Sequence, residues 1–438
     1  MNTLSTGKHT IAGYTIDVLD VLGSGTQGDV YKVDVDGRQY AMKWYHTGNN
    51  DPTQRKRLRG LAEKPAPSDR FLWPTIYLQE GDRFGYLMDL CPTSFKGIHH
   101  LLGGAANISF RNLVRMCLQL VTEFRSLHNA GFCYGDVSHN NIFFRPDTGD
   151  IRIIDNDNVV VDGSDDFGVL GTPKYMAPEI VRGEKLPSAD TDAFSLAVLI
   201  YYTLMLEHPL HGRREYNIHA MDGPAMDQLY GHDPVFMFDP NDRSNRPVSG
   251  YHDTAKLYWD IYPGYLKEAF TKTFTDGLAD ARARVTNFEW QKILTRLHDN
   301  IVHCPKCDSQ NFYDLDYVKR HNGQMGTCWH DGAQLYMPPR MRFDNSHVII
   351  LTHDATLYEF HVNPQTSASD HRFAFENPVA EVAKHPTKDI WGLKNLSSND
   401  WRIEKKNGDS HVVPRGRSVS FSDEMVIDFG QRKAQVRG

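Results

Sequence analysis

The amino-acid sequence predicts an α+β protein whose strands come first, whose helices follow, and whose last part is a β-sandwich. Three observations support this prediction. Up to about residue 95, apolar and polar side chains alternate around turn residues, as they do in half-buried strands. Apolar residues then recur at helical spacing from Asn112 to His128 and from Asp192 to Glu207. A period of two returns from about residue 340 to the end of the chain.

The composition excludes several classes of protein. Of the 438 residues, 40% are hydrophobic and 24% are charged, as is usual in globular proteins of two or three domains. The net charge of −7 gives no general attraction to nucleic acid. The longest mostly apolar run, Leu196 to Leu206, is about half as long as a membrane-spanning helix, and the N-terminus lacks the apolar stretch of a signal peptide. Because the six cysteines do not form a disulfide framework, we expect a cytoplasmic protein without membrane or nucleic-acid partners.

Turn and boundary signals place the individual elements. Asp36-Gly37 separates two strand-like runs, and a tight hairpin is expected there because both residues tolerate positive φ. The segment Gly212–Pro263 is rich in Asp, Pro, Gly and Tyr and has little periodicity, so we expect a long ordered insertion. A further helix is expected from Thr286 to His298, before the composition changes to a segment with cysteine and histidine.

A glycine-rich segment near the N-terminus is a candidate phosphate-binding loop. Gly23, Gly25 and Gly28 would let the backbone approach phosphate oxygens and offer N–H donors to them. The same spacing occurs in dinucleotide-binding folds, but there a helix must follow. Here a strand and a hairpin follow, which favours a glycine-rich β-hairpin that covers phosphates. Fifteen residues after Gly28, Lys43 lies in an apolar strand, where burial is costly unless the ammonium group meets an anion.

Three further segments carry hard oxygen ligands and turn residues. Asp136 and Asn141 lie five residues apart, and Asp155 ends the apolar strand that begins at Ile151. This combination suits a magnesium–nucleotide site, because Mg²⁺ prefers oxygen ligands and needs few of them from the protein. The sequence GTPKYMAPE follows at residues 171–179.

In this order and spacing, the five segments resemble the signature of protein kinases, over roughly residues 10 to 300. The resemblance implies a two-lobed fold, with an N-terminal tail at 1–9, an N-lobe at 10–90 and a C-lobe at 91–300. It also implies an ATP- and magnesium-dependent enzyme that transfers the γ-phosphoryl group to serine or threonine of proteins. A pseudokinase scaffold with little turnover and a kinase-fold enzyme with a small-molecule acceptor are the alternatives.

The resemblance also implies a role for each matched residue. Asp136 would orient the substrate hydroxyl and accept its proton, Lys43 would hold the α- and β-phosphates, and Asn141 and Asp155 would bind Mg²⁺. Tyr86 to Cys91 resembles the gatekeeper strand and hinge, and Asp192 would anchor the catalytic loop. The residues implied to bind nucleotide are Gly23, Gly25, Gly28, Val30, Lys43, Met88, Asp89 and Cys91.

Several positions depart from the kinase pattern. Gly135 replaces the arginine that would meet a phosphate on the activation loop, so we expect weak dependence on loop phosphorylation. Ser138 stands where serine/threonine kinases carry a lysine, and Asn156 replaces the phenylalanine that distinguishes active from inactive states. The glutamate that pairs with the strand lysine is not evident, because Glu63, the only carboxylate at a suitable distance, precedes Lys64-Pro65.

Two hydroxyls between Asp155 and Ala177 are candidates for autophosphorylation or substrate contact. Thr172 is expected to line the substrate platform. Ser164, beside Asp165-Asp166, is the better autophosphorylation candidate.

The cysteine segment at 301–338 predicts a structural zinc site. Cys304 and Cys307 are followed twenty residues later by Cys328, and then by His330 and Asp331. Three thiolates with one imidazole or carboxylate complete a tetrahedral zinc site. His330 is the commoner ligand type, whereas Asp331 has the regular knuckle spacing, so both remain candidates for the fourth ligand.

Residues 339–438 have the pattern of a small β-sandwich, with a hairpin turn at Asn407-Gly408. Trp391–Ser397 and Ile427–Gly430 are similar to the later strands of forkhead-associated domains, which bind phosphothreonine. Asp370-His371-Arg372 and Arg415-Gly416-Arg417 are only loose substitutes for the phosphate-binding segments of those domains, which favours a protein-docking module.

The whole arrangement resembles bacterial kinases of tellurite-resistance-type signalling triads, which join a eukaryotic-like kinase domain to a zinc knuckle and this β-domain. That resemblance implies a von Willebrand factor A-type protein and a metal-dependent protein phosphatase as partners or substrates.

Overall fold

The computed structural model describes residues 4–48, 51–164, 167–168, 170–344, 347–365, 375 and 377–438. The chain forms two compact units. Unit 1 contains Met1–Asn107, Ser126–Leu199 and Ile218–Pro234, and unit 2 contains Ile108–Arg125, Ile200–Asn217 and Val235–Gly438.

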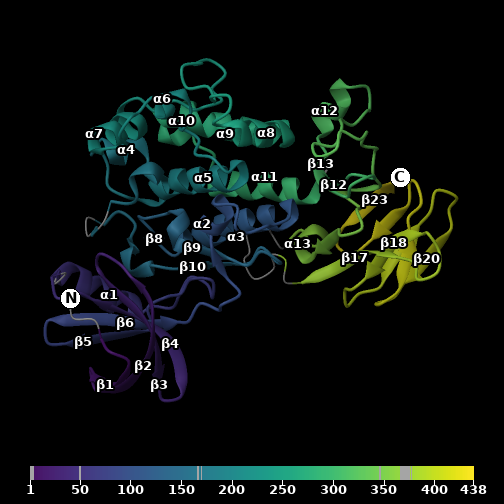
Figure 1. Ribbon diagram of the computed structural model, residues 1–438. Helices are drawn as coiled ribbons and strands as arrows, with labels where there is room; N and C mark the ends of the chain where they lie inside the picture. Colours follow the sequence, from purple (N-terminus) through teal and green to yellow (C-terminus); the bar gives the residue numbers. More distant parts are fainter. Residues whose placement is uncertain are drawn as a thin grey trace. The chain divides into compact units, whose positions relative to one another are not determined.

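Unit 1 is built on a six-stranded antiparallel sheet, drawn in purple and blue in Figure 1, with the order β1-β2-β3-β4-β6-β5. Its strands are β1 (Gly7–Ile11), β2 (Tyr14–Ser24), β3 (Gly28–Val35), β4 (Arg38–Tyr45), β5 (Ile76–Glu80) and β6 (Arg83–Asp89). Strands β3 and β4 are joined at Asp36 and Gly37, whose φ angles of 52° and 83° confirm the predicted hairpin turn. Apolar side chains on one face form a buried core that includes Ile16, Tyr31 and Trp44.

Helix α1 (Pro52–Ala62) covers part of this sheet. It begins at Asp51, whose side chain accepts a hydrogen bond from the backbone of Thr53, with a proline at the first helical position. The helix buries Leu58 and Leu61, and Trp73 donates its indole N–H to the carbonyl of Leu61 at 3.0 Å. The exposed face of α1 is basic, and the helix contains no acidic residue.

Short elements complete unit 1 and carry most of the candidate catalytic residues. Strands β7 (Lys96–Gly97), β9 (Ile142–Phe144) and β10 (Ile151–Ile153) form one small sheet, and β8 (Phe132–Cys133) pairs with β11 (Val160–Val161). The helical pieces are α2 (His99–Leu102), η1 (His139–Asn141), η2 (Asn156–Asn158), η3 (Pro173–Tyr175), α4 (Pro178–Val181), α7 (Gly223–Met226) and the π-type turn η4 (Asp227–His232). Two long helices, α3 (Phe110–Asn129) and α5 (Ala189–Met205), contribute residues to both units and lie within three residues of their predicted bounds.

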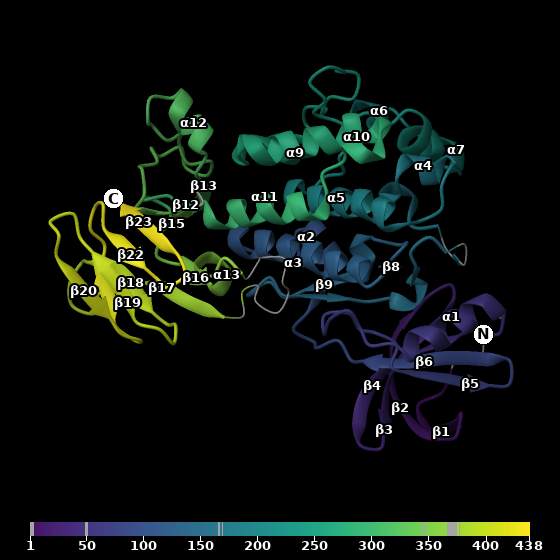
Figure 2. The same cartoon turned by 180° about the vertical axis from the view of Figure 1, so that it is seen from behind.

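The helices of unit 2 are shown in green in Figure 2. They are α6 (Arg213–Tyr216), α8 (Asp253–Ile261), α9 (Gly264–Phe274), α10 (Asp276–Ala279), η5 (Ala281–Ala283) and α11 (Asn287–Asp299). Helix α11 begins at Thr286, which forms a reciprocal capping box with Glu289, so the predicted start is confirmed. Helices α6, α7 and α8 lie in the segment 212–263, where the sequence showed little periodicity because short helices alternate with Pro- and Asp-rich turns.

The C-terminal part of unit 2 is rich in β-strands, as predicted. After β12 (Ile301–His303), β13 (Gln310–Phe312) and α12 (Leu315–Arg320), two antiparallel sheets have the orders β15-β14-β23-β22-β19-β20 and β16-β17-β18-β21. Side chains from both sheets, among them Leu357, Trp401 and Val436, form one buried core. The strands are β14 (Arg340–Phe343), β15 (Val348–Ile350), β16 (Thr356–Tyr358), β17 (Pro378–Lys384), β18 (Trp391–Asn395), β19 (Trp401–Glu404), β20 (Ser410–Val413), β21 (Ser418–Ser420), β22 (Val426–Asp428) and β23 (Lys433–Arg437).

The predicted turn at Asn407-Gly408 joins β19 and β20 as an antiparallel hairpin, and Gly408 has a φ of 85°. The short helix α13 (Glu359–Val362) follows β16.

Two buried or half-buried carboxylates connect these strands to the helices of unit 2. Asp299, at the end of α11, accepts hydrogen bonds from His298 (3.0 Å), from His347 before β15 (2.7 Å) and from His361 in α13 (3.0 Å). Asp354, in the turn after β15, pairs with Arg111 of α3 through two bonds of 2.8 and 2.9 Å. Among the described residues, no helix has both the length and the hydropathy that crossing a bilayer requires.

Candidate active site

The glycine-rich segment forms the tip of the β2–β3 hairpin in unit 1. Gly28 lies so close to β4 that a Cβ atom would be 2.5 Å from the carbonyl oxygen of Trp44, and this position therefore requires glycine. The tip is closed by a hydrogen bond of 2.9 Å from the backbone N–H of Gly25 to the carbonyl of Gly28. Gly23 and Gly25 are exposed, so their backbone is accessible to a ligand.

Lys43 lies on β4 opposite Val30 of β3, and its ammonium group is almost fully buried. Its Nζ contacts Oδ1 of Asp155 at 2.6 Å and Oδ2 of Asp157 at 2.8 Å. Burial alone would lower the pKa of Lys43, but the charges of Asp157 and Asp155 outweigh it and raise this pKa above its ordinary value. The lysine is therefore permanently cationic, as a phosphate-binding group must be.

Asp157 is a site residue that sequence reasoning did not identify. Its side chain is 0% exposed, and it accepts hydrogen bonds from Lys43 and from the hydroxyl of Tyr45. Burial alone would raise the pKa of Asp157, but its contacts with Lys43 and Tyr45 lower it, so the carboxylate stays ionised. The available signal was a second aspartate two residues after Asp155, in a chain whose α1 offers no carboxylate.

The two aspartates of this segment differ in exposure. The side chain of Asp155 is 39% exposed, and its backbone adopts the left-handed conformation with φ 59°. Burial and the neighbouring charge of Asp157 raise the pKa of Asp155, while Lys43 lowers it. Asp155 is thus open to a ligand, whereas Asp157 is enclosed and serves Lys43 alone among the charged groups.

Asp136 and Asn141 are brought together by the loop that precedes β9. The amide nitrogen of Asn141 donates to the backbone carbonyl of Asp136 at 2.9 Å and to its Oδ2 at 3.3 Å. The hydroxyl of Thr172 donates to Oδ1 of Asp136 at 2.7 Å. Both carboxylate oxygens of Asp136 are therefore held in place, and the amide oxygen of Asn141 is left for a cation.

Asp192, in the first turn of α5, anchors the start of this loop. Its carboxylate accepts the backbone N–H groups of Tyr134 at 2.6 Å and Gly135 at 3.0 Å. It is 2% exposed, and His128 approaches it at 3.1 Å. The predicted anchoring contact of Asp192 is thus present in the structure.

Comparison with known proteins identifies the family. The sequence pattern of the protein kinase domain matches residues 16–247, which is more than half of the chain. The chain belongs to the protein kinase family. This span includes the glycine-rich loop and all the candidate catalytic residues named above.

Curated relatives of this kinase are serine/threonine kinases by name. A probable cell cycle serine/threonine-protein kinase, CDC5 homolog, of Encephalitozoon cuniculi is 26% identical over 213 residues, which are 46% of this chain and 44% of the relative. The probable serine/threonine-protein kinase RTK1 of Saccharomyces cerevisiae is 23% identical over 211 residues, 43% of this chain and 33% of the relative. Protein kinase C delta type of Mus musculus is 34% identical over 101 residues, 22% and 14% of the two chains.

These matches confirm the predicted enzyme class, a protein serine/threonine kinase. The chain spans less than half of the length of each of these relatives.

The kinase lacks the helical glutamate that usually pairs with the strand lysine. Glu63 caps the C-terminus of α1 and is exposed, and the carboxylates that contact Lys43 are those of Asp155 and Asp157. Helix α1 instead touches the metal-binding segment through Arg57, whose Nε donates to the backbone carbonyl of Asp157 at 3.0 Å. The ion pair of this kinase is therefore built within the segment 155–157 and not across to the helix.

The other departures from the kinase pattern have local structural reasons. Gly135 has a φ of +78°, a conformation that an arginine would adopt only with strain. Asn156 is fully buried, and its amide donates to the carbonyls of Leu72 and Ile153 at 2.9 and 3.0 Å, which fixes it where a mobile phenylalanine would lie. Ser138 is 1% exposed, so its hydroxyl does not replace the lysine as a solvent-facing group.

The residues predicted to contact the nucleotide base lie beside one another in unit 1. Val30, Ala41, Met88, Leu90, Cys91 and Ile154 contribute to one apolar cluster. Burial raises the pKa of the Cys91 thiol to about 11, so this thiol is neutral. Asp89 points its carboxylate to the surface, where it pairs with Arg38 at 2.8 Å, so only its backbone is available to a base.

The cysteine segment of unit 2 brings four ligand atoms together. Cys304, Cys307, Cys328 and Asp331 place one ligand atom each within 4.8 Å of one another. The Sγ atoms of Cys307 and Cys328 are 3.7 Å apart, which is close to the separation of two thiolates on one zinc ion. His330 is exposed and donates only its backbone N–H to the sulfur of Cys328, at 3.4 Å. Of the two candidates for the fourth ligand, the geometry brings Asp331 to the cluster and leaves His330 outside it.

The candidate phosphopeptide-binding segments give no assembled site. Asp370-His371-Arg372 lies outside the described residues. Arg415-Gly416-Arg417 is exposed in the turn between β20 and β21, where the backbone of Gly416 and Arg417 bonds to Asn395. The second half of the activation-segment prediction, Ser164, lies after β11 with its neighbours Asp165 and Asp166 outside the described residues.

Proposed function

We propose that this chain is an ATP- and Mg²⁺-dependent kinase that transfers the γ-phosphoryl group to serine or threonine residues of protein substrates. One observation carries the proposal. Within unit 1, a buried lysine, a half-exposed aspartate and an oriented Asp–Asn pair converge, and the charge of Asp136 is felt at Asp155. This set of groups can bind phosphates, hold a divalent cation and accept a proton from a hydroxyl.

The proposed chemistry is positioning and charge neutralisation. The backbone of Gly23, Gly25 and Gly28 would cover the phosphates, and Lys43 would bind the α- and β-phosphate oxygens. Asp136 would accept a hydrogen bond from the substrate hydroxyl and take its proton as the phosphoryl group moves. Thr172 supports this role, because its bond to Asp136 fixes one carboxylate oxygen and turns the carboxylate toward the substrate side.

The residues present fit a magnesium ion. Asp155 offers an exposed carboxylate, and the amide of Asn141 directs its nitrogen to Asp136, so its oxygen remains for a cation. When bound, Mg²⁺ would neutralise charge on the nucleotide phosphates. The residues proposed to hold it are Asn141 and Asp155.

Phosphoryl transfer can be tested directly with the full chain. We expect label from γ-labelled ATP to reach serine or threonine of the protein or of a generic acceptor when Mg²⁺ is present. Asp136→Ala and Asp155→Ala should lose the label, whereas Asp147→Ala, a change to an exposed aspartate near the same loop, should keep it.

The outcomes separate the competing functions. Binding of ATP that raises the unfolding temperature, without any label transfer, would overturn the proposal in favour of a pseudokinase scaffold. Label that reaches only a small molecule would point to a different acceptor class.

We further propose that Cys304, Cys307, Cys328 and Asp331 bind one structural zinc ion. The convergence of their ligand atoms supports this, and so do the backbone N–H groups of Lys306 and His330, which point at the sulfurs of Cys304 and Cys328 and would stabilise thiolate charge. Burial around the cluster is slight, so the segment needs a metal to hold its fold.

Metal analysis and thermal unfolding test the zinc proposal. We expect about one zinc ion per chain at this site, lost in Cys307→Ser and weakened in Asp331→Ala, with a lower unfolding temperature in both. His330→Ala should retain the metal. A His330 variant that loses zinc while Asp331→Ala keeps it would reverse the assignment of the fourth ligand.

The remaining parts of the proposal concern organisation and partners. The proposed divisions are an N-lobe at 10–90, a C-lobe at 91–300, a zinc knuckle at 301–338 and a docking β-sandwich of forkhead-associated type at 339–438. The proposed setting is a bacterial cytoplasm, with a von Willebrand factor A-type protein and a metal-dependent phosphatase as partners.

A further inference from the structure

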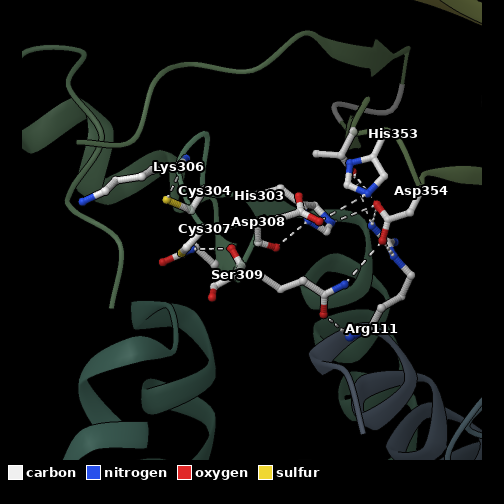
Figure 3. A network of polar contacts seen from close by, with 12 residues as sticks. Arg111, His303, Cys304, Lys306, Cys307, Asp308, Ser309, His353 and Asp354 are labelled. Atoms are coloured by element: carbon white, nitrogen blue, oxygen red, sulfur yellow. Dashed lines mark hydrogen bonds and ion pairs between the residues drawn. The ribbon is translucent and has the colours of Figure 1, made fainter. Parts of the chain in front are cut away.

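Three side chains near the cysteine cluster form a second group of possible metal ligands (Figure 3). They are His303 at the end of β12, Asp308 in the turn after Cys307, and His353 in the turn between β15 and β16. Nδ1 of His303 is 3.0 Å from Oδ1 of Asp308, and Nε2 of His353 is 4.0 Å from Oδ2 of the same carboxylate. The two imidazole rings meet edge to face, with their centroids 4.3 Å apart. One ligand atom from each residue lies within 4.8 Å of the others.

The ring of His303 is oriented by a second layer of polar groups. Its other nitrogen, Nε2, is 3.1 Å from Oδ1 of Asp354. Asp354 is held in turn by the two bonds from Arg111, as Figure 3 shows. Histidines that bind metals usually direct their second ring nitrogen at a carboxylate, which fixes the ring and increases the basicity of the ligating nitrogen. In this arrangement Nδ1 is the ligating atom of His303, and it faces Asp308.

The exposure of the group suits an exchangeable metal site. The side chains of Asp308 and His353 are 72% and 42% exposed, whereas that of His303 is 12% exposed. One anchored ligand and two accessible ones leave room for an ion to enter and for water to complete its coordination. Asp308 can also offer its backbone carbonyl, which lies 3.0 Å from the same Nδ1 atom.

The cluster around Asp299 lacks these properties, although its residues are similarly close. The backbone N–H of Tyr358 donates to Nδ1 of His361 at 2.9 Å, so the proton of this neutral imidazole must reside on Nε2. That Nε2 points at Asp299 and donates to it, and it therefore has no lone pair for a metal. The Asp299 cluster is a closed hydrogen-bonded network, while the group at His303 has an unprotected carboxylate and an accessible imidazole.

We propose that His303, Asp308 and His353 bind a divalent transition-metal ion such as Zn²⁺, in a site separate from the cysteine cluster. Two imidazoles and one carboxylate are a donor set that such ions accept. The bound ion would join the turn after β15 to the turn that follows Cys307. It would thereby fasten the C-terminal strands to the cysteine segment.

Titration of the full chain with Zn²⁺ tests this site. Protein with its cysteine cluster already filled should bind one further equivalent of Zn²⁺, measured by calorimetry and by metal analysis after gel filtration. His353→Ala and Asp308→Asn should remove this second equivalent while leaving the first in place. Asparagine is chosen at 308 because it tolerates the left-handed backbone of Asp308, whose φ is 59°.

Two further variants separate ligands from their support. Asp354→Asn should weaken the second equivalent by about 10–100-fold without abolishing it, because it disturbs only the group that orients His303. His411→Ala, a change to an exposed histidine on β20, should have no effect. Absence of a second equivalent in the wild-type chain, or a second equivalent that survives both His353→Ala and Asp308→Asn, would overturn the proposal. Cys307→Ser should retain the site, which distinguishes it from the cysteine cluster.

Discussion

Replacement of Asp157 with asparagine is expected to lower kcat/KM for ATP by about 10²-fold or more. The substitution keeps the shape of the side chain but removes the buried charge that holds Lys43. When Asp155 is engaged with a metal ion, Asp157 is the remaining carboxylate partner of that lysine. Without it, the ammonium group would be drawn toward Asp155 and away from the phosphates. Steady-state kinetics at several ATP concentrations would measure the loss.

A double-mutant cycle shows whether Asp157 acts through Lys43. The variant with both Lys43→Met and Asp157→Asn should be no less active than Lys43→Met alone, because the two residues contribute one interaction. Glu63→Gln should leave kcat/KM unchanged, since Glu63 is an exposed cap of α1. Losses that multiply in the double variant, or a fully active Asp157→Asn, would contradict the assignment.

Replacement of Asp299 with alanine is expected to reduce the free energy of unfolding of unit 2 by about 3–5 kcal/mol. Burial alone would raise the pKa of Asp299, but its contacts with His361, His298 and His347 hold this pKa well below its ordinary value. The carboxylate is therefore ionised at neutral pH and accepts three N–H donors. Alanine would leave those donors without an acceptor, two of them in a buried setting.

Urea unfolding followed by tryptophan fluorescence would measure this change, with Trp290 and Trp401 both buried in unit 2. Asp389→Ala is the matched control, because Asp389 pairs with Lys384 at 2.7 Å but lies on the surface. It should have no measurable effect on the unfolding midpoint. Equal midpoints for the Asp299 and Asp389 variants would show that the histidine cluster does not stabilise the unit.

The elements predicted best from the sequence are those with strong local signals. The hairpins at Asp36-Gly37 and Asn407-Gly408 follow from the backbone preferences of their turn residues. Helix α11 is marked by its capping residue Thr286 and by regular apolar spacing. By contrast, α8 lies in a segment where aromatic and acidic residues obscure the helical period, so periodicity alone did not place it.

The missed or unresolved site residues all depend on contacts between distant segments. The pairing of Asp157 with Lys43 joins residues 114 positions apart, and no local pattern distinguishes a buried aspartate from an exposed one. The choice between His330 and Asp331 depended on the direction in which one turn points its side chains. His353 is brought to His303 by the packing of strands fifty residues later in the chain, a neighbourhood that spacing cannot reveal.

The source of the lysine's partner bears on how such an enzyme can be switched on and off. Where a helix supplies that partner, outward displacement of the helix breaks the ion pair and silences catalysis. In this chain the partner and the metal-binding aspartate belong to the same short segment, and Asn156 between them is fixed by two hydrogen bonds. Displacement of α1 would leave the lysine pair intact, so regulators that act on this helix have little leverage. We expect control to be exerted on access of substrates or on the abundance of the protein.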